Sequence, residues 1–434
     1  MEVIDGRRPG LLVLDMSYTL KMFRERQLEQ ALDSRRLDGY FGKVISVHPL
    51  AALFESGSVR HGVPAVTELD AHQVFVEGKL GRFETLRILA PLNFVLAQAS
   101  LMRLLIRMGR EAGVSVVRVG DPYYLGVMGW ILARRLDVPL AIRVPFRYDE
   151  IRRVTGRATM PRLFRFGWVE KLLERFVFPR CDLIAGANED NRRYALENGG
   201  RAEVSTVFRY GNLLHPSHWI EPCHRPAADR DLAELGLDGK SFIATVARLE
   251  PMKRVDDAIR ATGELVRRGH DIHLLVVGHG ALQQDLFGLA MSLGLERRIA
   301  FAGNRDQDWI ARVLPRASVI VSPHMGRALA EAALSAVPIV AFDYDWQREI
   351  VVTGETGYLV ANGDWRAMAD DAERLLGDPV RARMMGETAR AKVAAMMDPV
   401  ALTRHEQATY TRLIERWPSR RGPGLPVPSK QRGR

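Results

Sequence analysis

The sequence predicts two α/β domains, each built on a doubly wound parallel β-sheet with helices on its faces. In both halves of the chain, short apolar stretches typical of strands alternate with amphipathic stretches typical of helices. This alternation is the pattern of successive βαβ units. A length of 434 residues is too great for one hydrophobic core and suits two domains of about 200 residues each. A stretch with three prolines and no periodicity, residues 211–230, separates the two halves.

The second half of the chain shows the alternation most regularly. Its strand candidates are short apolar runs at residues 241–246, 272–277, 298–302, 317–321, 338–342 and 357–360. Its helical candidates repeat apolar residues every three or four positions, at residues 255–268, 281–293, 307–314, 327–336 and 365–376. These segments predict a parallel sheet in which each strand is followed by a helix.

The first half repeats the pattern less regularly. Its strand candidates are residues 11–15, 44–48, 114–119, 139–144, 183–186 and 203–208. Its helical candidates are residues 20–32, 88–108, 124–136, 168–178 and 189–197. Pro91 and Arg103 make the second of these an amphipathic or kinked helix rather than a membrane span. Residues 57–82 lack a clear period and are predicted to be loop with one short strand.

These segments give the expected domain boundaries. We expect an N-terminal domain at residues 1–215, a C-terminal domain at residues 216–400 and a last helix at residues 401–417. Residues 418–434 hold four prolines and five basic residues, which predicts a disordered basic tail.

Charge and cysteine content narrow the class of protein. The chain has 62 basic and 52 acidic residues, a net charge of +10. This excess fits an anionic substrate, an anionic membrane surface or simply a compositional bias towards arginine. The aromatic residues do not interleave with a basic stripe, which disfavours nucleic acid. Two cysteines, no signal-like start and no run of 18 apolar residues predict a cytoplasmic protein without a membrane span.

A basic loop marks the strongest candidate site. Arg248 and Lys253 lie in the loop that follows the strand candidate 241–246 and precedes the next helix. A strand, a short basic loop and a helix start together form an anion site at the carboxyl edge of a parallel sheet. Glu331 lies near the start of another helix that follows another strand. Basic groups for a diphosphate and a carboxylate for sugar hydroxyls favour an enzyme that uses a nucleotide sugar.

Five ordered motifs in the second half resemble the family 4 retaining glycosyltransferases, which have the GT-B fold. They are TVARLEPMKRVDDAIRA at 245–261, LLVVGHGALQQDL at 274–286, IAFAGNRDQDWIARVLPRASVIVSP at 299–323, ALAEAALSAVPIVAFD at 328–343 and EIVVTGETGYLVANGD at 349–364. The resemblance implies two Rossmann-like domains facing across a cleft, with the nucleotide bound mainly by the C-terminal domain. It also implies that the last helix crosses back to the N-terminal domain.

The resemblance assigns roles to the donor-side residues. Arg248 and Lys253 match the basic pair that contacts the donor diphosphate, and they are the expected catalytic residues. Glu331 matches the glutamate that accepts hydrogen bonds from the ribose hydroxyls. The remaining donor-side residues form the surrounding glycine turns and loops, and they are Gly278, Gly303, Asn304, Gly326 and Arg327.

One position departs from the family pattern. The family carries a further glutamate about two helical turns before the one matched by Glu331, and Pro323 stands there in this chain. His324 could replace part of its role and Arg327 could add a phosphate contact, or both could be ordinary loop residues. The departure leaves recognition of the sugar, and to a lesser degree activity, open.

The N-terminal domain is expected to hold the acceptor. Ser17 and Thr19 follow the first strand candidate, where other members have a glycine-rich loop, and they serve either the acceptor or the helix N-terminus. Asp121 follows the strand candidate 114–119 and resembles a family corner at the cleft edge. Arg147 follows the strand candidate 139–144, where the family often has a histidine, and is a candidate for contact with the acceptor.

The expected reaction needs neither a metal nor a cofactor. The sequence shows no His/Cys spacing for zinc and no convincing pair of catalytic carboxylates. The resemblance implies that the departing diphosphate itself takes the acceptor proton. The expected partners are a nucleotide sugar and a glycan or lipid-linked acceptor, as in cell-envelope polysaccharide synthesis. Peripheral contact with the inner face of an anionic membrane is left open. A non-catalytic GT-B protein, an epimerase or a phosphorylase are the alternatives.

Overall fold

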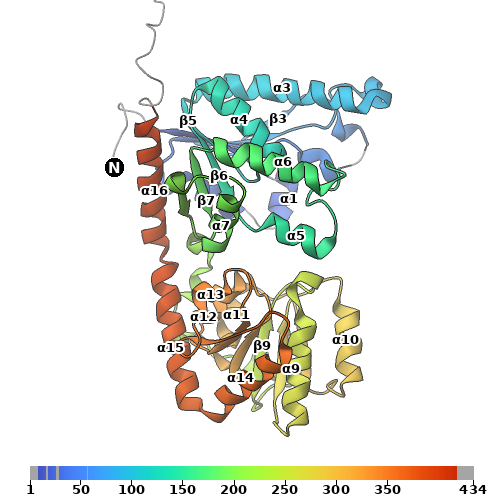
Figure 1. Ribbon diagram of the computed structural model, residues 1–434, viewed down its shortest axis with the longest axis vertical. Helices are drawn as coiled ribbons and strands as arrows, with labels where there is room; N and C mark the ends of the chain where they lie inside the picture. The colour runs from blue at the N-terminus through green and yellow to red at the C-terminus, as the bar shows by residue number, and fades with distance from the viewer. Residues whose placement is uncertain (1–7, 16–17, 26–28, 56, 418–434) are drawn as a thin grey trace, which may run out of the picture. The chain divides into compact units, whose positions relative to one another are not determined.

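The computed structural model describes residues 8–417 except residues 16–17, 26–28 and 56 (Figure 1). The chain divides into two compact units, each described by itself below. Unit 1 comprises Met1–Leu213 and Pro399–Arg434, and unit 2 comprises Leu214–Asp398. The predicted pair of α/β domains with parallel sheets is confirmed.

Unit 1 is built on an eight-stranded sheet in the order β3-β4-β2-β1-β5-β6-β7-β8. Each strand runs parallel to its neighbours except β3, which is antiparallel to β4. The strands are β1 Gly10–Leu14, β2 Lys43–His48, β3 Ala65–Glu68, β4 Gln73–Glu77, β5 Val114–Val119, β6 Leu140–Val144, β7 Leu183–Gly186 and β8 Ser205–Val207. All five residues of β1 are buried, as expected of a central parallel strand covered on both faces.

Helices cover the unit 1 sheet, and the last helix of the chain belongs to them. They are α1 Leu20–Glu25, α2 Glu29–Asp33, α3 Ala90–Glu111, α4 Tyr124–Leu136, α5 Tyr148–Thr155, α6 Gly167–Val177, α7 Glu189–Glu197 and α16 Pro399–Arg416. Glu406 of α16 is buried and accepts a hydrogen bond of 3.2 Å from Arg143 of β6. The ring of Tyr410, one turn further along α16, packs edge-on against Phe41 at 5.2 Å. An ion pair inside the protein and a buried aromatic contact thus fix α16 to unit 1.

Unit 2 is built on a six-stranded parallel sheet in the order β11-β10-β9-β12-β13-β14. Its strands are β9 Phe242–Val246, β10 His273–Val277, β11 Ile299–Gly303, β12 Val319–Ser322, β13 Ile339–Phe342 and β14 Gly357–Val360. Its helices are α8 Asp229–Glu234, α9 Val255–Arg267, α10 Gln283–Ser292, α11 Gln307–Val313, α12 Ala328–Ala333, α13 Gln347–Ile350, α14 Trp365–Gly377 and α15 Pro379–Met396. Buried aliphatic residues on both faces of the sheet form two cores.

Two sequence predictions about secondary structure were wrong or incomplete. Residues 57–82 contain two paired strands, β3 and β4, rather than one. The edge strand β3 was missed because three of its four residues are exposed, so it lacks the alternation of a half-buried strand. The predicted helix 88–108 begins at Ala90, with Pro91 in its first turn, so the proline does not kink it.

Four helices were also not predicted, and they are α5, α8, α13 and α15. The eight residues of α5 form too short a segment for periodicity to stand out. Helix α15 is long, but its buried side is made largely of small residues, such as Ala382, Gly386 and Ala389. Small residues give a weak hydrophobic pattern even when they pack closely.

Gly386 allows a close approach that we expect to be measurable. A Cβ atom at this position would lie 2.1 Å from the carbonyl oxygen of Ala336, whereas one at Gly288 in α10 would meet no heavy atom within 4 Å. Gly386→Ala should therefore lower the free energy of unfolding by about 1–3 kcal/mol through overpacking. Gly288→Ala should raise it by about 0.5–1 kcal/mol through helix propensity. Denaturant unfolding of both variants tests this, and a stabilised Gly386→Ala would contradict the packing of α15.

Candidate functional site

The order of strands in unit 2 reverses at β9. Strand β10 follows β9 on one side of it, and β12 lies on the other side. In open α/β sheets, ligands bind outside the carboxyl ends of the strands at such a switch point. The loops that follow β9 and β12 therefore define the candidate site from topology alone.

The loop after β9 is held in place by the loop after β10. Ala247 donates its backbone N–H to Val277 O at 3.0 Å, and Leu249 donates to His279 O at 3.1 Å. Gly278 has φ +136, and a Cβ there would lie 1.9 Å from Ala247 O. Only glycine allows the two backbones to approach so closely. The glycine predicted to be a nucleotide-side turn thus also shapes the basic loop.

The Lys253 amine lies against the loop that follows β12. Lys253 ends a short 3₁₀ helix, Pro251–Lys253, and its side chain is half-buried. A Cβ atom on Gly326, where φ is +68, would come within 3.2 Å of Lys253 Nζ. Burial, and then the charge of Arg248, lower the pKa of Lys253. Among the described residues this amine forms no ion pair, although the charges of Asp345 and Glu250 oppose the fall in its pKa. It therefore offers a hydrogen-bond donor at the switch point.

Arg248, the other predicted basic residue, is much more exposed. Its side chain is 72% exposed and Nη1 donates to Glu250 Oε1 at 2.7 Å. An exposed pair of this kind is worth little and is readily exchanged for a stronger anion. The structure therefore brings Arg248 and Lys253 into one loop, with Lys253 ordered by packing and Arg248 open to solvent.

Glu331 is buried in the first turn of α12. Its side chain is 5% exposed, and Arg327 Nε lies 3.8 Å from Oε1. Burial raises the pKa of Glu331, while the nearby charge of Arg327 lowers it. A buried carboxylate with one distant cation retains acceptor capacity for ligand hydroxyls. Gly326, Arg327 and Glu331 all belong to the segment that follows β12, as the motif predicted.

Both ring nitrogens of His324 lie close to acceptor atoms. The residue before it, Pro323, stands at the position where the family pattern has a glutamate. His324 Nδ1 lies 3.1 Å from the Met252 carbonyl oxygen and its Nε2 lies 3.2 Å from Asp345 Oδ2. Both neighbours are hydrogen-bond acceptors, and each lies within reach of one ring nitrogen. His324 therefore ties the loop after β12 to the basic loop after β9.

Gln347 fixes the same loop from the other side. The side chain is fully buried and Nε2 donates to the carbonyl oxygens of Pro323 at 3.1 Å and Phe342 at 2.9 Å. Neither Gln347 nor Asp345 was among the predicted site residues. A glutamine among charged and aromatic residues and an aspartate in a turn carry no signal that distinguishes them from ordinary residues.

The nucleotide-side residues after β11 join the same edge of the sheet. Gly278 donates its N–H to Gly303 O at 2.9 Å, and Gly303 has φ +68. Asn304, the next residue, is exposed. A continuous line of loops thus runs from Asn304 through Gly278 to the basic loop and Gly326.

In unit 1, the strand order reverses at β1, which lies between β2 and β5. Ser17 lies outside the described residues. Thr19 Oγ1 accepts a hydrogen bond from Met22 N at 3.2 Å, so this hydroxyl caps α1. Asp121, after β5, is buried and accepts from Tyr123 N at 2.7 Å. Burial raises the pKa of Asp121 to about 7, with a smaller contribution in the same direction from Asp15.

Arg147 is occupied by acidic neighbours within unit 1. Its guanidinium lies 3.1 Å from Asp149, 3.3 Å from Asp190 and 2.9 Å from Glu197. These three carboxylates neutralise the charge that an acceptor would otherwise meet. Of the acceptor-side candidates that the structure describes, Thr19 follows β1 and Asp121 follows β5, so both lie near the switch point.

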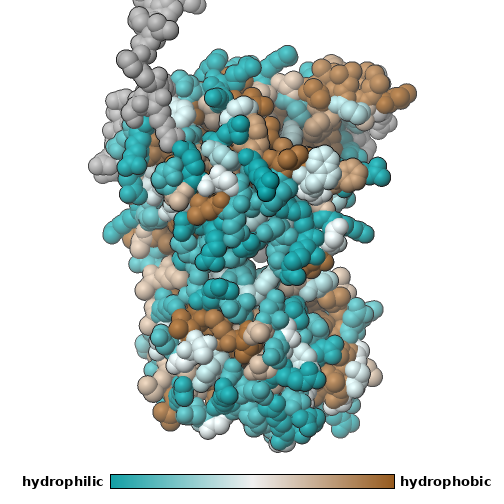
Figure 2. Space-filling model, in the orientation of Figure 1, coloured by the Kyte–Doolittle hydropathy of each residue, from teal (hydrophilic) through white to brown (hydrophobic). Residues whose placement is uncertain are grey.

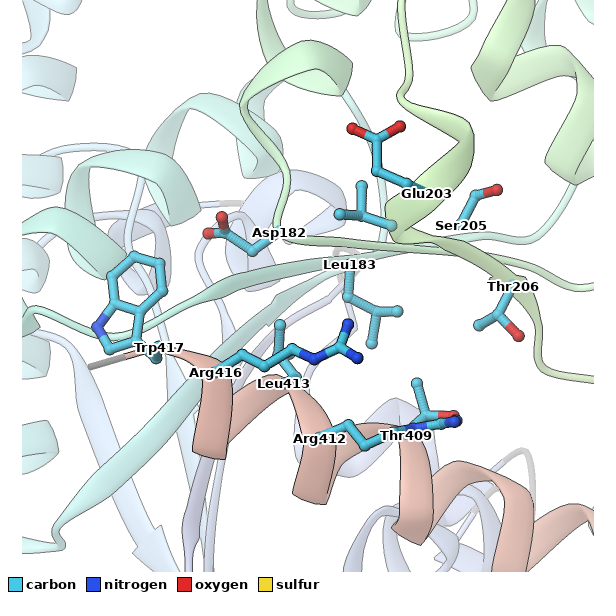
Figure 3. A pocket seen from close by; sticks show the side chains of 11 residues that line it. Asp182, Leu183, Glu203, Ser205, Thr206, Thr409, Arg412, Leu413, Arg416 and Trp417 are labelled. Carbon is cyan, nitrogen blue, oxygen red and sulfur yellow. The ribbon is translucent and has the colours of Figure 1, made fainter. Parts of the chain in front are cut away.

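A cavity of about 280 Å³ lies between β7, β8 and α16 in unit 1 (Figure 3). Arg412 and Arg416 border it from α16, and Asp182 and Glu203 border it from the sheet side. Asp182 precedes β7, so the cavity lies at the amino ends of the strands. Substrates of such sheets bind at the carboxyl ends, so we do not assign this cavity to the reaction. Among the described residues, no cluster of His, Cys, Asp and Glu could hold a metal ion.

The chain is similar to known glycosyltransferases. The family described as "Glycosyl transferases group 1" matches residues 228–392, which contain the whole unit 2 site. The alpha-D-kanosaminyltransferase of Streptomyces kanamyceticus is 31% identical over 274 residues, which cover 61% of this chain and 68% of that protein. The D-inositol 3-phosphate glycosyltransferase of Nocardia farcinica is 34% identical over 294 residues, covering 64% of this chain and 62% of that protein. The chain therefore belongs to the group 1 glycosyltransferase family.

Solved structures confirm the fold class. HepE of Anabaena, solved in complex with UDP and glucose, has a TM-score of 0.65 at 17% identity and covers 93% of this chain and 100% of that chain. The sucrose-phosphate synthase of Thermosynechococcus elongatus has a TM-score of 0.68 at 19% identity and covers 94% of this chain and 100% of that chain. The predicted GT-B fold, with two Rossmann-like domains, is confirmed.

Asp121 should make the stability of unit 1 depend on pH. Between its unfolded pKa of 3.8 and its folded pKa of about 7, the folded protein keeps a proton that the unfolded chain releases. Stability should therefore fall as pH rises through this window, by up to about 1.4 kcal/mol for each pH unit. Asp121→Asn should remove this part of the slope. Denaturant unfolding at pH 5, 6, 7 and 8 measures it, and parallel profiles for the two proteins would contradict the assignment.

Proposed function

We propose that this protein transfers a sugar from a nucleoside-diphosphate sugar to a hydroxyl acceptor with retention of the anomeric configuration, as in family 4. The observation that carries the proposal is the Lys253 amine, half-buried against Gly326 at the strand-order reversal of unit 2. Relatives named as kanosaminyl- and inositol 3-phosphate glycosyltransferases support sugar transfer. In this proposal unit 2 holds the donor and unit 1 holds the acceptor.

The donor diphosphate would bind between the two loops of the unit 2 site. Lys253 would donate to it from a position already ordered by packing, and Arg248 would leave Glu250 to add a second, forked contact. Negative charge grows on the diphosphate as the glycosidic bond breaks. Cations fixed there before the reaction stabilise that charge without reorganisation, which is the largest contribution we expect from the protein.

The remaining donor contacts follow from the same edge of the sheet. Glu331 would accept hydrogen bonds from the ribose hydroxyls, and the base would lie by the loops at Gly278 and Gly303. The Gly326 turn and Arg327 would complete the diphosphate site. The chemistry would then be simple: the sugar carbon loses its bond to the diphosphate oxygen and gains one to the acceptor oxygen. The acceptor proton passes to the departing diphosphate.

A second candidate function is binding of a nucleotide sugar without transfer. Pro323 removes the carboxylate of the family pattern, and His324 turns its ring to Met252 and Asp345 instead. A thermal-shift screen with UDP-, GDP-, ADP- and dTDP-sugars identifies the donor, because a ligand of the folded state stabilises it by mass action. Incubation of that donor with mixed hydroxyl acceptors then separates the candidates. Transfer with an unchanged anomeric configuration by NMR supports the proposal, and binding without transfer or hydrolysis supports the second candidate.

Lys253→Ala should remove most of the transfer activity. Loss of one fixed cation at the departing diphosphate should cost about 2–4 kcal/mol at the transition state, or roughly 30- to 1000-fold in kcat/KM. Lys240→Ala, which changes an exposed lysine just before β9, is the matched control and should stay close to wild type. Both variants should unfold at the wild-type temperature. Near wild-type turnover in folded Lys253→Ala would refute the site.

Glu331→Ala should abolish discrimination between ribose and deoxyribose. Hydrogen bonds to a charged acceptor contribute about 1.5–3 kcal/mol, so we expect roughly 10- to 150-fold weaker binding of the preferred nucleoside diphosphate. Calorimetry with the ribonucleotide and its 2′,3′-dideoxy analogue separates this role from a structural one. The wild type should prefer the ribonucleotide and the variant should bind both equally. A variant that keeps the wild-type preference would exclude Glu331 from ribose recognition.

A further inference from the structure

The solvent-facing side of α3 is apolar over one half of the helix and positively charged over the other. One stripe of this helix, spaced by three or four residues, is buried against unit 1 and consists of Asn93, Ala97, Leu101, Leu105 and Gly109. The opposite stripe begins with Leu92 and Leu96 and continues to Arg103, Arg107 and Arg110, all of them exposed. The exposed face is therefore apolar in its first turns and cationic in its last turns.

The apolar half forms a continuous exposed patch with the segment that precedes the helix. Ile88 is 96% exposed, and Leu89, Leu92 and Val95 are each at least half exposed. Phe83 lies at the edge of this patch and is also exposed. Figure 2 shows hydrophobic residues gathered over this end of α3. Water-soluble surfaces rarely leave such a group of large aliphatic residues uncovered, so the patch marks an interaction site.

The segment that carries the patch is ordered by hydrogen bonds. The buried amide of Asn93 accepts hydrogen bonds from Arg82 N at 2.6 Å and Phe83 N at 2.9 Å, and donates one to Phe83 O at 2.7 Å. Gln98 of α3 also donates to Lys79 O at 2.9 Å. These contacts hold the residues before the helix in a fixed position. The exposure of the apolar side chains is therefore part of the folded structure.

The cationic half has no acidic residue to balance it. From Thr85 to Arg110 the chain contains no aspartate or glutamate, and Glu84 and Glu111 lie just outside this stretch. Arg110 donates to the Arg135 carbonyl oxygen at 3.5 Å, which brings the exposed end of α4 and a further arginine to the same place. The helix thus joins an apolar group to a row of cations with no intervening negative charge.

We propose that this α3 surface docks on an anionic membrane. The aliphatic side chains would enter the boundary between headgroups and acyl chains, and the arginines would contact anionic headgroups. A second copy of the chain fits less well, because parallel packing would set one row of arginines against the other. Within the described part of the chain, no helix is long and apolar enough to cross a membrane, so docking would be peripheral.

Docking selects one class of acceptor for the proposed transfer. The inference about the acceptor rests on the proposed function, in which unit 1 holds the acceptor. Unit 1 is also the unit that would lie on the membrane. We infer that the acceptor is a lipid-linked hydroxyl compound rather than a small soluble molecule. Attraction to the membrane itself depends on α3 and not on catalysis.

Vesicle flotation with the full chain tests the proposal. We use phosphatidylcholine vesicles with and without 30 mol% phosphatidylglycerol (about a third anionic, enough to attract a basic patch). The wild type should float only with the anionic vesicles. Ile88→Gln combined with Leu92→Gln should reduce the bound fraction at least about tenfold, as should Arg103→Gln combined with Arg107→Gln. The matched control is Val380→Gln with Met384→Gln, two exposed apolar residues one turn apart on α15, and it should bind like the wild type.

Three outcomes would overturn the proposal. In the first, the wild type does not bind anionic vesicles. In the second, the α3 variants bind as well as the wild type. In the third, light scattering shows that the wild type is a dimer and that Ile88→Gln with Leu92→Gln converts it to a monomer. Binding that persists in the α3 variants but is lost when residues 418–434 are removed assigns it to the tail and refutes the α3 surface. Lys253→Ala should float like the wild type while transfer is lost. Normal flotation of a wild type that shows no transfer would refute the proposed function alone.

Discussion

The position of the Lys253 amine next to Gly326 is the constraint on which the proposed donor site depends. It joins the loop after β9 to the loop after β12, the two strands at which the sheet reverses its order. A Cβ atom at Gly326 would crowd this amine at 3.2 Å, and the positive φ of Gly326 already disfavours other residues. Since the amine is partly desolvated and lacks an ion-pair partner among the described residues, an arriving diphosphate would meet a charge held ready for it.

The substitution of Pro323 for the family glutamate changes how this constraint is maintained. Gln347 holds the backbone of the loop, and His324 bridges from it to the Met252 carbonyl and to Asp345. The loop is therefore ordered without the missing carboxylate. In the proposed donor site, the sugar hydroxyls would lose the acceptor that this carboxylate offers in the family pattern.

Much of the fold was predicted from the sequence, because a parallel sheet produces a regular alternation of apolar strand segments and amphipathic helical segments. Buried strands such as β5 and helices such as α4 were predicted to the residue, since apolar runs and helical periods are local signals. The edge strand β3 and the small-residue helix α15 were not, because their stability comes from neighbours distant in sequence. For the candidate site, the motifs predicted that Lys253 follows β9 and that Glu331 lies in the helix after β12, and the structure has both residues there. The parts played by His324, Gln347 and Asp345 depend on side-chain contacts that no local pattern records.

The most direct test of the account is a crystal structure with the nucleoside diphosphate, among UDP, GDP, ADP and dTDP, that most raises the melting temperature. We predict that its diphosphate lies within hydrogen-bonding distance of Lys253 Nζ and of the backbone at Gly326, with the ribose hydroxyls on Glu331. A diphosphate bound elsewhere, or none of the four nucleotides stabilising the protein, would contradict the central claim that the β9 and β12 loops form the donor site.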